Sequence, residues 1–303
     1  MKNKGMVKRI ISLLLVIAMV AVFVPSNVNA ASKKNGWVTK KGYKYYVMAG
    51  RTQTGFVTIK KKTYYFAPKK MTARYNDKKF VVAPKGAMLK GWYKIKKNYY
   101  YFDRINGKMA KSTTVDGIKI NKKGIAKKTS YNIKKINVMI LAREVMMSIT
   151  KPGDAKDVKR EKCYDFVMDE FVKTSTTDSS GIIHFETEHE SRGWDLKFAS
   201  FGLENRMGDC VSWAASVAYL LQECGYKNVY IVTDSKKTTY SNSGMAHAWA
   251  QAAGRVYDAY FGSYKGKDAN YDAGYACNNT GSYKDWPVYM KNISTGEVSD
   301  WEY

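Results

Sequence analysis

Hydrophobic and polar residues follow two different rhythms along this chain. Between residues 31 and 130, short aromatic clusters alternate with lysine-rich stretches too brief for a helix, and this pattern predicts β-hairpins. From residue 131 on, apolar residues recur at helical spacing, first from Ile133 to Val145 and then from Val158 to Val172, with Pro152-Gly153 between the two runs. The pattern therefore predicts a hairpin region followed by an α+β region.

The hairpin region repeats itself. Its units open at Gly36-Trp37, Gly55-Phe56 and Gly91-Trp92, which are 19 and 36 residues apart, so one unit has about 18 to 20 residues. A degenerate unit over residues 75–88 fills the wider gap, and a unit without aromatic residues, 117–126, caps the end. Because one short hairpin cannot bury its aromatic face alone, we expect stacked hairpins to form a solenoid with aromatic seams between units.

The second region continues with further helices and strands. A third helix is expected from Cys210 to Gly225, with Gly208-Asp209 as its turn and N-cap. A buried strand over residues 229–233 and a hairpin of residues 246–252 and 255–261 come after it. Residues 182–190 fit either a strand or an extended loop.

The first 30 residues have the pattern of a secretory signal. Basic residues from Lys2 to Arg9 precede an apolar run over residues 10–24, and Val28-Asn29-Ala30 is a small-x-small cleavage site. The run falls short of the ~20 residues that span a bilayer, so no transmembrane anchor is expected after cleavage. The expected organisation is a signal peptide (1–30), a hairpin domain (31–130) and a second domain (131–303) of a secreted protein.

Charge separates the same two domains. Residues 31–130 hold 27 Lys and Arg against three acidic residues, whereas residues 131–303 hold 20 against 23. Clustered lysines attract phosphate polymers, which could be an anionic wall polymer such as teichoic acid or a nucleic acid. The predicted export favours the wall, so no nucleic-acid partner is expected.

Three residues of the second domain suit nucleophilic catalysis. Cys210 begins the third predicted helix, where the positive end of the helix dipole favours a thiolate. His247 and Asp258 lie on facing strands of the predicted hairpin and point to the same face, so the carboxylate can orient the imidazole toward the thiol. We expect Cys210 as nucleophile, His247 as base and Asp258 as orienter. The backbone N–H of Cys210, or the side chain of Asn205, would stabilise the oxyanion.

The other cysteines do not make a disulfide scaffold. If Cys210 stays free, Cys163 and Cys277 are the one pair considered for a bridge, and Cys224 is expected to be a buried apolar residue. His184 and His189 alternate with glutamates, which is typical of a solvated strand face rather than a zinc site. No metal and no cofactor is expected.

The repeats resemble the cell-wall-binding repeats of Gram-positive surface proteins, of the choline-binding and glucan-binding type. The resemblance rests on the Gly-Trp and Gly-Phe openings, the Tyr-Tyr-Phe strands and the closing Gly107-Lys108-Met109-Ala110. It implies a cell-wall location and aromatic cages between hairpins that hold choline or a sugar; the alternative is that the rings serve packing only. The rings that would contact the wall polymer are Trp37, Tyr45, Tyr46, Phe56, Tyr64, Tyr65, Trp92, Tyr100 and Tyr101.

Residues 135–265 resemble the transglutaminase-like superfamily of papain-like fold. The resemblance rests on the run from Gly208 to Gly225, on His247-Ala248-Trp249 and on Tyr257-Asp258, with a His-to-Asp gap of eleven residues that is shorter than in many members. It implies an α+β papain-like transglutaminase core behind the β-hairpin solenoid. It also implies acyl transfer or hydrolysis on glutamine-type amides or peptide bonds of a protein or peptide substrate, through a cysteine thioester. The alternatives are a cysteine peptidase of wall or host proteins and a non-catalytic wall-bound adhesin or scaffold.

Overall fold

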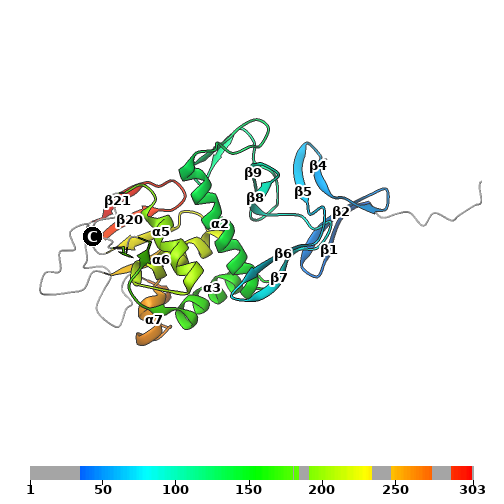
Figure 1. The fold of residues 1–303 in the computed structure, drawn as a ribbon. Helices are drawn as coiled ribbons and strands as arrows, with labels where there is room; N and C mark the ends of the chain where they lie inside the picture. The colour runs from blue at the N-terminus through cyan, green and yellow to red at the C-terminus, as the bar shows by residue number, and fades with distance from the viewer. Residues whose placement is uncertain (1–34, 180, 184–190, 234–246, 275–287, 302–303) are drawn as a thin grey trace, which may run out of the picture.

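The computed structural model describes residues 35–179, 181–183, 191–233, 247–274 and 288–301. A row of β-hairpins lies at one end of an elongated molecule, and helices with an antiparallel sheet lie at the other (Figure 1). We refer to these two parts as the hairpin module and the helical module. The last β-bridge of the hairpins joins Ile120 to Ala126, and the first helix of the second module begins at Ser130. The predicted signal, residues 1–30, falls outside the described residues.

The hairpin module consists of antiparallel strand pairs joined by tight turns. The turns place residues such as Lys60 and Lys61 at positive φ (46° and 64°), the geometry that matches the twist of paired strands. The strands are β1 (Gly36–Lys40), β2 (Tyr43–Met48), β3 (Arg51–Thr52), β4 (Gly55–Ile59), β5 (Lys62–Phe66), β6 (Met71–Tyr75), β7 (Lys78–Ala83), β8 (Gly91–Ile95), β9 (Asn98–Phe102), β10 (Thr113–Val115) and β11 (Ile118–Ile120).

The hairpin of β6 and β7 is an insertion and not a repeat unit. Phe66, at the end of β5, forms a β-bridge with Met88, and the backbone N–H of Ala67 donates to the carbonyl oxygen of Ala87 at 2.8 Å. The chain therefore returns to its starting point, and residues 86–88 close the unit that Gly55 opens. The predicted degenerate unit over residues 75–88 is wrong, because alternating apolar residues around a lysine-rich turn describe any hairpin, repeated or inserted.

The inserted hairpin and one tight turn connect the two modules. The hydroxyl of Tyr75 at the tip of β6 donates to the carbonyl oxygen of Leu203 at 2.6 Å. Gly42 in the β1–β2 turn packs so closely on the helical module that a Cβ there would lie 2.5 Å from the backbone nitrogen of Gly153. A side chain at Gly42 would therefore push the modules apart.

The helical module packs its helices against a six-stranded antiparallel sheet. The helices are α2 (Ser130–Ile149), α3 (Lys156–Glu170), α5 (Trp194–Asn205), α6 (Cys210–Glu223) and α7 (Ala259–Lys265). In spatial order, the sheet contains β19 (Tyr271–Ala273), β18 (Arg255–Tyr257), β17 (Ala248–Ala252), β16 (Tyr230–Thr233), β20 (Val288–Asn292) and β21 (Val298–Trp301). Two short pairs stand apart from it: β12 (Val172–Lys173) with β15 (Met207–Gly208), and β13 (Thr177–Asp178) with β14 (Gly181–Ile182).

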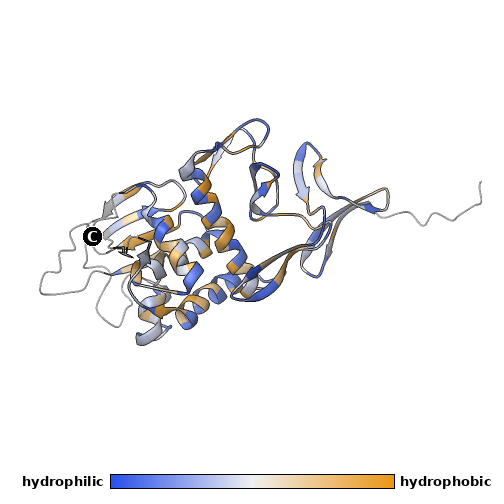
Figure 2. Cartoon of the chain, in the orientation of Figure 1, coloured by the Kyte–Doolittle hydropathy of each residue, from blue (hydrophilic) through white to orange (hydrophobic). Residues whose placement is uncertain are grey.

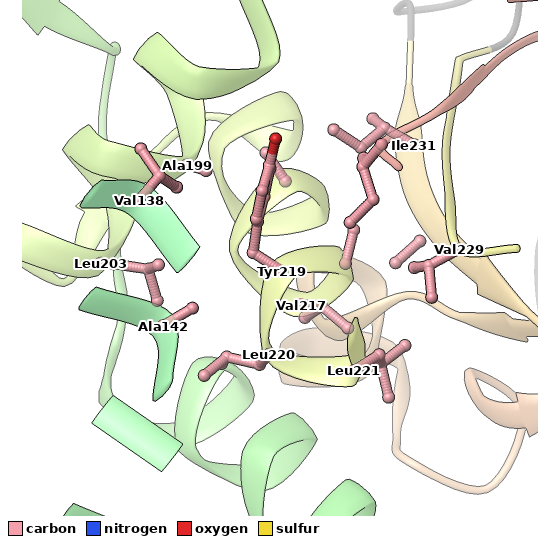
Figure 3. Packing of buried hydrophobic residues seen from close by; sticks show 14 of the residues in the cluster. Val138, Ala142, Ala199, Leu203, Val217, Tyr219, Leu220, Leu221, Val229 and Ile231 are labelled. Carbon is pink, nitrogen blue, oxygen red and sulfur yellow. The ribbon is translucent and has the colours of Figure 1, made fainter. Parts of the chain in front are cut away.

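Helix α6 is the buried centre of this module. All its residues from Val211 to Glu223 are buried, and most of them are apolar. Figure 3 shows its side chains between α2 and α5 on one side and Val229 and Ile231 on the other. The surrounding helices carry both hydrophobic and hydrophilic residues (Figure 2). None of the helices in the described ranges is long and apolar enough to cross a membrane.

The predicted ends of α6 are confirmed, and two other helices were missed. The Asp209 carboxylate accepts a hydrogen bond from the N–H of Ser212 at 2.9 Å, and Gly225 comes after the helix at a φ of 94°. Helix α5 was not predicted, and α7 occupies residues that were predicted as strand. β18 ends at Tyr257 because Asp258 caps α7 and turns the chain. Residues 184–190 of the ambiguous segment lie outside the described residues.

Candidate functional site

In each of the three repeat units, the aromatic residue after the opening glycine faces a tyrosine across the two strands. The pairs are Trp37 with Tyr46, Phe56 with Tyr65, and Trp92 with Tyr101. Each pair faces the following unit, so three aromatic seams form along the module. We name them the first, second and third seam in chain order.

The first and second seams are three-sided and partly open to solvent. In the first, the Trp37 ring lies 5.2 Å from Tyr46 and 5.0 Å from Tyr64 of the next unit, at 67° and 76° between ring planes. In the second, Phe56 lies 4.6 Å from Tyr65 and 5.2 Å from Tyr100, at 67° and 61°. Trp37 and Phe56 are 45% and 46% exposed. Rings at steep angles with an open side can hold an organic cation or the apolar face of a sugar.

The third seam is occupied by the protein itself. The capping unit offers no aromatic ring, and the guanidinium of Arg104 lies 5.2 Å from the centre of the Tyr101 ring. Arg104 also pairs with Asp116 at 3.0 Å and with Glu223 of α6 at 2.7 Å, while the Trp92 indole N–H donates to Asp116 at 2.8 Å. An internal cation thus fills this seam and connects it to the last residue of α6.

Of the nine predicted wall-polymer residues, seven lie either in an open seam or beside a surface groove, and the other two lie in the covered third seam. Trp92 and Tyr101 are only 1% and 8% exposed, because the helical module covers the third seam. Tyr45 lies off the seams, where it lines a groove with Lys40, Lys41 and Lys85. The remaining six rings form the two open seams.

The candidate nucleophile begins the central helix. Cys210 is the first residue of α6, and its side chain is partly exposed. The turn before it is fixed by the Trp213 indole, which donates to the carbonyl oxygen of Gly208 at 3.0 Å. A Cβ at Gly208, whose φ is 140°, would lie 2.5 Å from the Cβ of Ser212, so this position requires glycine.

The candidate base and orienter are in direct contact. His247 Nε2 lies 2.6 Å from Asp258 Oδ2, and the two residues are only 4% and 1% exposed. The other carboxylate oxygen, Oδ1, accepts a hydrogen bond from the N–H of Phe261 at 2.9 Å. Asp258 therefore orients the histidine and caps α7 at once, and Nδ1 is the ring nitrogen of His247 left for another partner.

Two aromatic residues that the sequence reasoning missed complete the surroundings of the histidine. The Phe261 ring stacks on the imidazole at 3.7 Å with 7° between the planes. Tyr260 lies 5.9 Å from the imidazole, and burial raises its pKa, with further increases from Cys210, Asp209 and Asp258. Tyr260 therefore lies beside His247 and feels the charges of both Cys210 and Asp258. The sequence signal that could have identified Tyr260 and Phe261 is their position directly after Asp258, at the start of a helix.

The described residues support neither an oxyanion role for Asn205 nor a disulfide at Cys163. Asn205 is exposed, and its amide donates to the carbonyl oxygen of Phe201 in its own helix at 2.9 Å. Cys163 is buried with its sulfur 3.8 Å from that of Cys224, and both thiols are free. Cys277, like His184 and His189, lies outside the described residues. Within the part of the chain that is described, no three His, Cys, Asp or Glu residues gather in a way that could hold a metal ion.

The hairpin module matches a known family. Residues 54–69 and 90–109, which hold the second and third aromatic pairs, match the family model described as a putative cell wall binding repeat. These are cell-wall-binding repeats. Both matched segments lie in the hairpin module, so the match does not extend to the candidate triad. No curated protein matches the chain.

Solved structures similar to part of this chain include choline-binding proteins of Streptococcus pneumoniae. The choline binding domain of Spr1274 from Streptococcus pneumoniae is 23% identical over 32% of this chain and 99% of that domain, with a TM-score of 0.24. CbpJ from the same species is 26% identical over 31% of this chain, with a TM-score of 0.15. The aligned part is 34% of CbpJ and 28% of the pneumococcal autolysin LytC, which is 16% identical over 31% of this chain with a TM-score of 0.14.

Proposed function

We propose that this chain is an exported protein of a Gram-positive-type cell wall that binds choline-bearing or sugar-bearing polymer in its first and second seams. The support is the open side of each seam, where an aromatic ring stays nearly half exposed inside a three-ring cluster. A quaternary ammonium group is recognised by such rings through cation–π attraction. Elution from isolated walls tests this: choline at constant ionic strength should release the protein, whereas release by salt alone would favour recognition of anionic teichoic acid by charge.

We further propose that the helical module is a papain-like thiol enzyme of the transglutaminase-like type. The observation that carries this proposal is the buried contact between His247 Nε2 and Asp258 Oδ2, with the Tyr260 ring 5.9 Å from the imidazole. A carboxylate held by a helix N-terminus keeps the imidazole in one tautomer, with the proton on Nε2 and the lone pair on Nδ1. Nδ1 can then accept the proton of a thiol at the start of α6.

The proposed reaction is acyl transfer through a thioester. The Cys210 sulfur attacks the carbonyl carbon of a glutamine-type amide or a peptide bond, and the protonated His247 gives its proton to the departing ammonia or amine. A lysine-type amine or water then attacks the thioester, with His247 as base, and the cysteine is released. A primary amine acceptor yields a cross-link and water yields hydrolysis; a peptidase would differ only in the bond cleaved.

Labelling with an electrophilic glutamine analogue tests the assignment. The reagent should modify Cys210 and leave Cys163, which is fully buried and whose thiol pKa is raised by that burial. Cys210→Ala should abolish both labelling and the incorporation of a primary amine into a glutamine donor while wall binding persists. Cys224→Ala, at the other end of α6, is the matched control. Turnover that survives Cys210→Ala would refute the enzyme proposal.

A non-catalytic wall-bound adhesin or scaffold is the second candidate. It is favoured by the family match, which accounts for the repeats and needs no chemistry from the helical module. In that case incubation with a glutamine donor and a primary amine would give neither an amine adduct nor new peptide termini, and wall binding would be the whole activity.

A further inference from the structure

A cavity of about 320 Å³ lies between the two modules. Its wall combines the β1–β2 turn, the end of β7 and residues 88–90 with the C-terminal half of α2, the loop after it and the end of α6. Its volume falls in the range of small-molecule sites. Neither the rings of the two open seams nor Cys210 belongs to this wall.

The cationic side chains around this cavity fall into two groups. The arginines are committed within the protein: Arg104 pairs with Glu223 and Asp116, and the Arg143 guanidinium lies 3.8 Å from the centre of the Tyr93 ring. The lysines are not. Among the described residues, no carboxylate lies within 4 Å of the side-chain nitrogen of any lysine in this wall, which are Lys44, Lys90, Lys151 and Lys159.

Two of these lysines, Lys44 and Lys159, repel a third, Lys90. Burial lowers the pKa of Lys90, and the charges of Lys159 and Lys44 lower it further, while the charge of Asp103 raises it. Like charges that converge on a partly buried lysine disfavour its charged form. An anion bound between them would convert this repulsion into attraction.

Apart from Thr39, Tyr43, Thr150 and Glu223, which pairs with Arg104, the rest of the wall is apolar. Met88, Leu89, Met146 and Met147 face the cavity together with the Tyr93 ring. Methionine side chains adapt to irregular shapes, so this surface suits an uncharged organic group of variable form. Lysines act as mobile point charges and bind phosphate oxygens without the fixed fork that arginine uses for planar carboxylates.

We propose that this cavity binds the phosphate group of a phosphate ester, with the uncharged part of the ligand resting on the methionine surface. Lys44 and Lys90 belong to the hairpin module, and Lys151 and Lys159 to the helical module. The ligand therefore contacts both modules and stabilises the joint between them. The site requires neither choline binding in the seams nor a reactive Cys210, so it goes beyond the proposed function.

Calorimetric titration of the full chain tests the site with two probes: glycerol 3-phosphate, a monoester, and glycerophosphoglycerol, a diester of the type found in wall polymers. The double substitution Lys90→Gln/Lys159→Gln should raise the Kd at least about tenfold. The matched control Lys122→Gln/Lys123→Gln removes the same charge from an exposed turn and should change the Kd less than about twofold. Choline affinity and Cys210 labelling should be the same in both double variants.

Either probe can support the site, and the diester identifies the source of the ligand. Saturable binding of both probes would make the wall polymer a source, and binding of the monoester alone would point to a free phosphomonoester. Equal losses in the two double variants, or no saturable binding of either probe, would overturn the proposal. Mass spectrometry gives a second measurement, on the wild-type protein. The bound probe should slow chemical acetylation of Lys90 but not of Lys122. An acetylation rate of Lys90 that the probe leaves unchanged would also overturn the proposal.

Discussion

The first and third aromatic seams are built from the same sequence pattern and do different things. In both, a tryptophan that comes after a glycine faces a tyrosine across the hairpin. In the first seam the next unit supplies Tyr64 and leaves Trp37 45% exposed, whereas in the third an arginine takes the place of a ligand and Trp92 is 1% exposed. One repeat motif therefore forms an open aromatic cluster, the proposed ligand site, in one position and the joint between modules in another.

The difference between the two seams lies in the next unit along the chain. The unit after Trp92 and Tyr101 is the capping hairpin, which carries Asp116 in its turn and no ring in its strands. Asp116 and Glu223 draw Arg104 over the Tyr101 ring, and the ion pairs are largely buried because the helical module covers them. The third seam thus stabilises the protein in the way that a bound cation would stabilise the other two.

Substitution of Arg104, the internal cation of the third seam, should have the largest effect on stability. Arg104→Met leaves the Asp116 and Glu223 carboxylates buried without their partner, and breaking a buried ion pair in this way costs about 3–5 kcal/mol. Urea unfolding should show this loss in the free energy of unfolding. Arg51→Met, at an exposed arginine of β3, is the control and should change the stability by less than about 0.5 kcal/mol. A loss as small as the control's would mean that the third seam does not hold the modules together.

The second largest effect on stability is a pH dependence, and it comes from a buried lysine near the ion pairs of Arg104. Lys135 of α2 is 2% exposed and donates to the carbonyl oxygen of Ser294 at 2.8 Å. Burial lowers its pKa to about 8; the charges of Asp195 and Asp116 raise it, and those of Lys291 and Arg104 lower it. Because the folded pKa lies below the unfolded value, the unfolded chain binds more protons between pH 8 and about 10.5, so stability rises with pH in that window.

This pH dependence is best measured as a difference between two proteins. The stability of the wild type relative to Lys135→Met should increase by about 2 kcal/mol between pH 7.5 and 9.5, since other titrating groups contribute to both proteins and cancel. Lys134→Met, at the exposed neighbouring position, should show no such change. A constant difference across this range would mean that Lys135 keeps an ordinary pKa and that the ionic cluster beside the third seam is more hydrated than its burial indicates.

The parts of the fold that depend on local pattern were predictable from the sequence. The tight hairpins, the N-cap at Asp209 and the glycine after α6 are all set by a few neighbouring residues. The insertion of β6 and β7 was not predictable, because only the return of Met88 to Phe66 identifies it. Helix α7 was missed since Asp258 ends a strand and caps a helix in one step, so strand periodicity runs directly into helical residues.

In the candidate sites, too, the features set by local sequence were predictable and those set by distant residues were not. The order Cys210, His247, Asp258 identified the carboxylate that the histidine contacts, although Asp258 lies at a helix start and not on the predicted strand. The stacking of Phe261 on His247 depends on α7 and had no periodic signal. The aromatic pairs were readable from the repeats, but the closure of the third seam was not, because Arg104 and Glu223 are 119 residues apart in sequence.

The smallest expected effect separates recognition from packing most directly. Trp37→Ala removes one wall of the first seam from a ring that is nearly half exposed, so it should weaken choline binding about tenfold, or about 1.4 kcal/mol, and lower stability by about 1 kcal/mol or less. Trp92→Phe is the matched change in the third seam: it keeps an aromatic ring, loses the indole hydrogen bond to Asp116 and should leave choline affinity unchanged while costing about 1 kcal/mol of stability. Calorimetric titration with choline and thermal unfolding of both variants give the two readouts. If Trp37→Ala reduced stability but not choline affinity, the first seam would be a packing contact like the third, and exposure of its tryptophan would have no role in recognition.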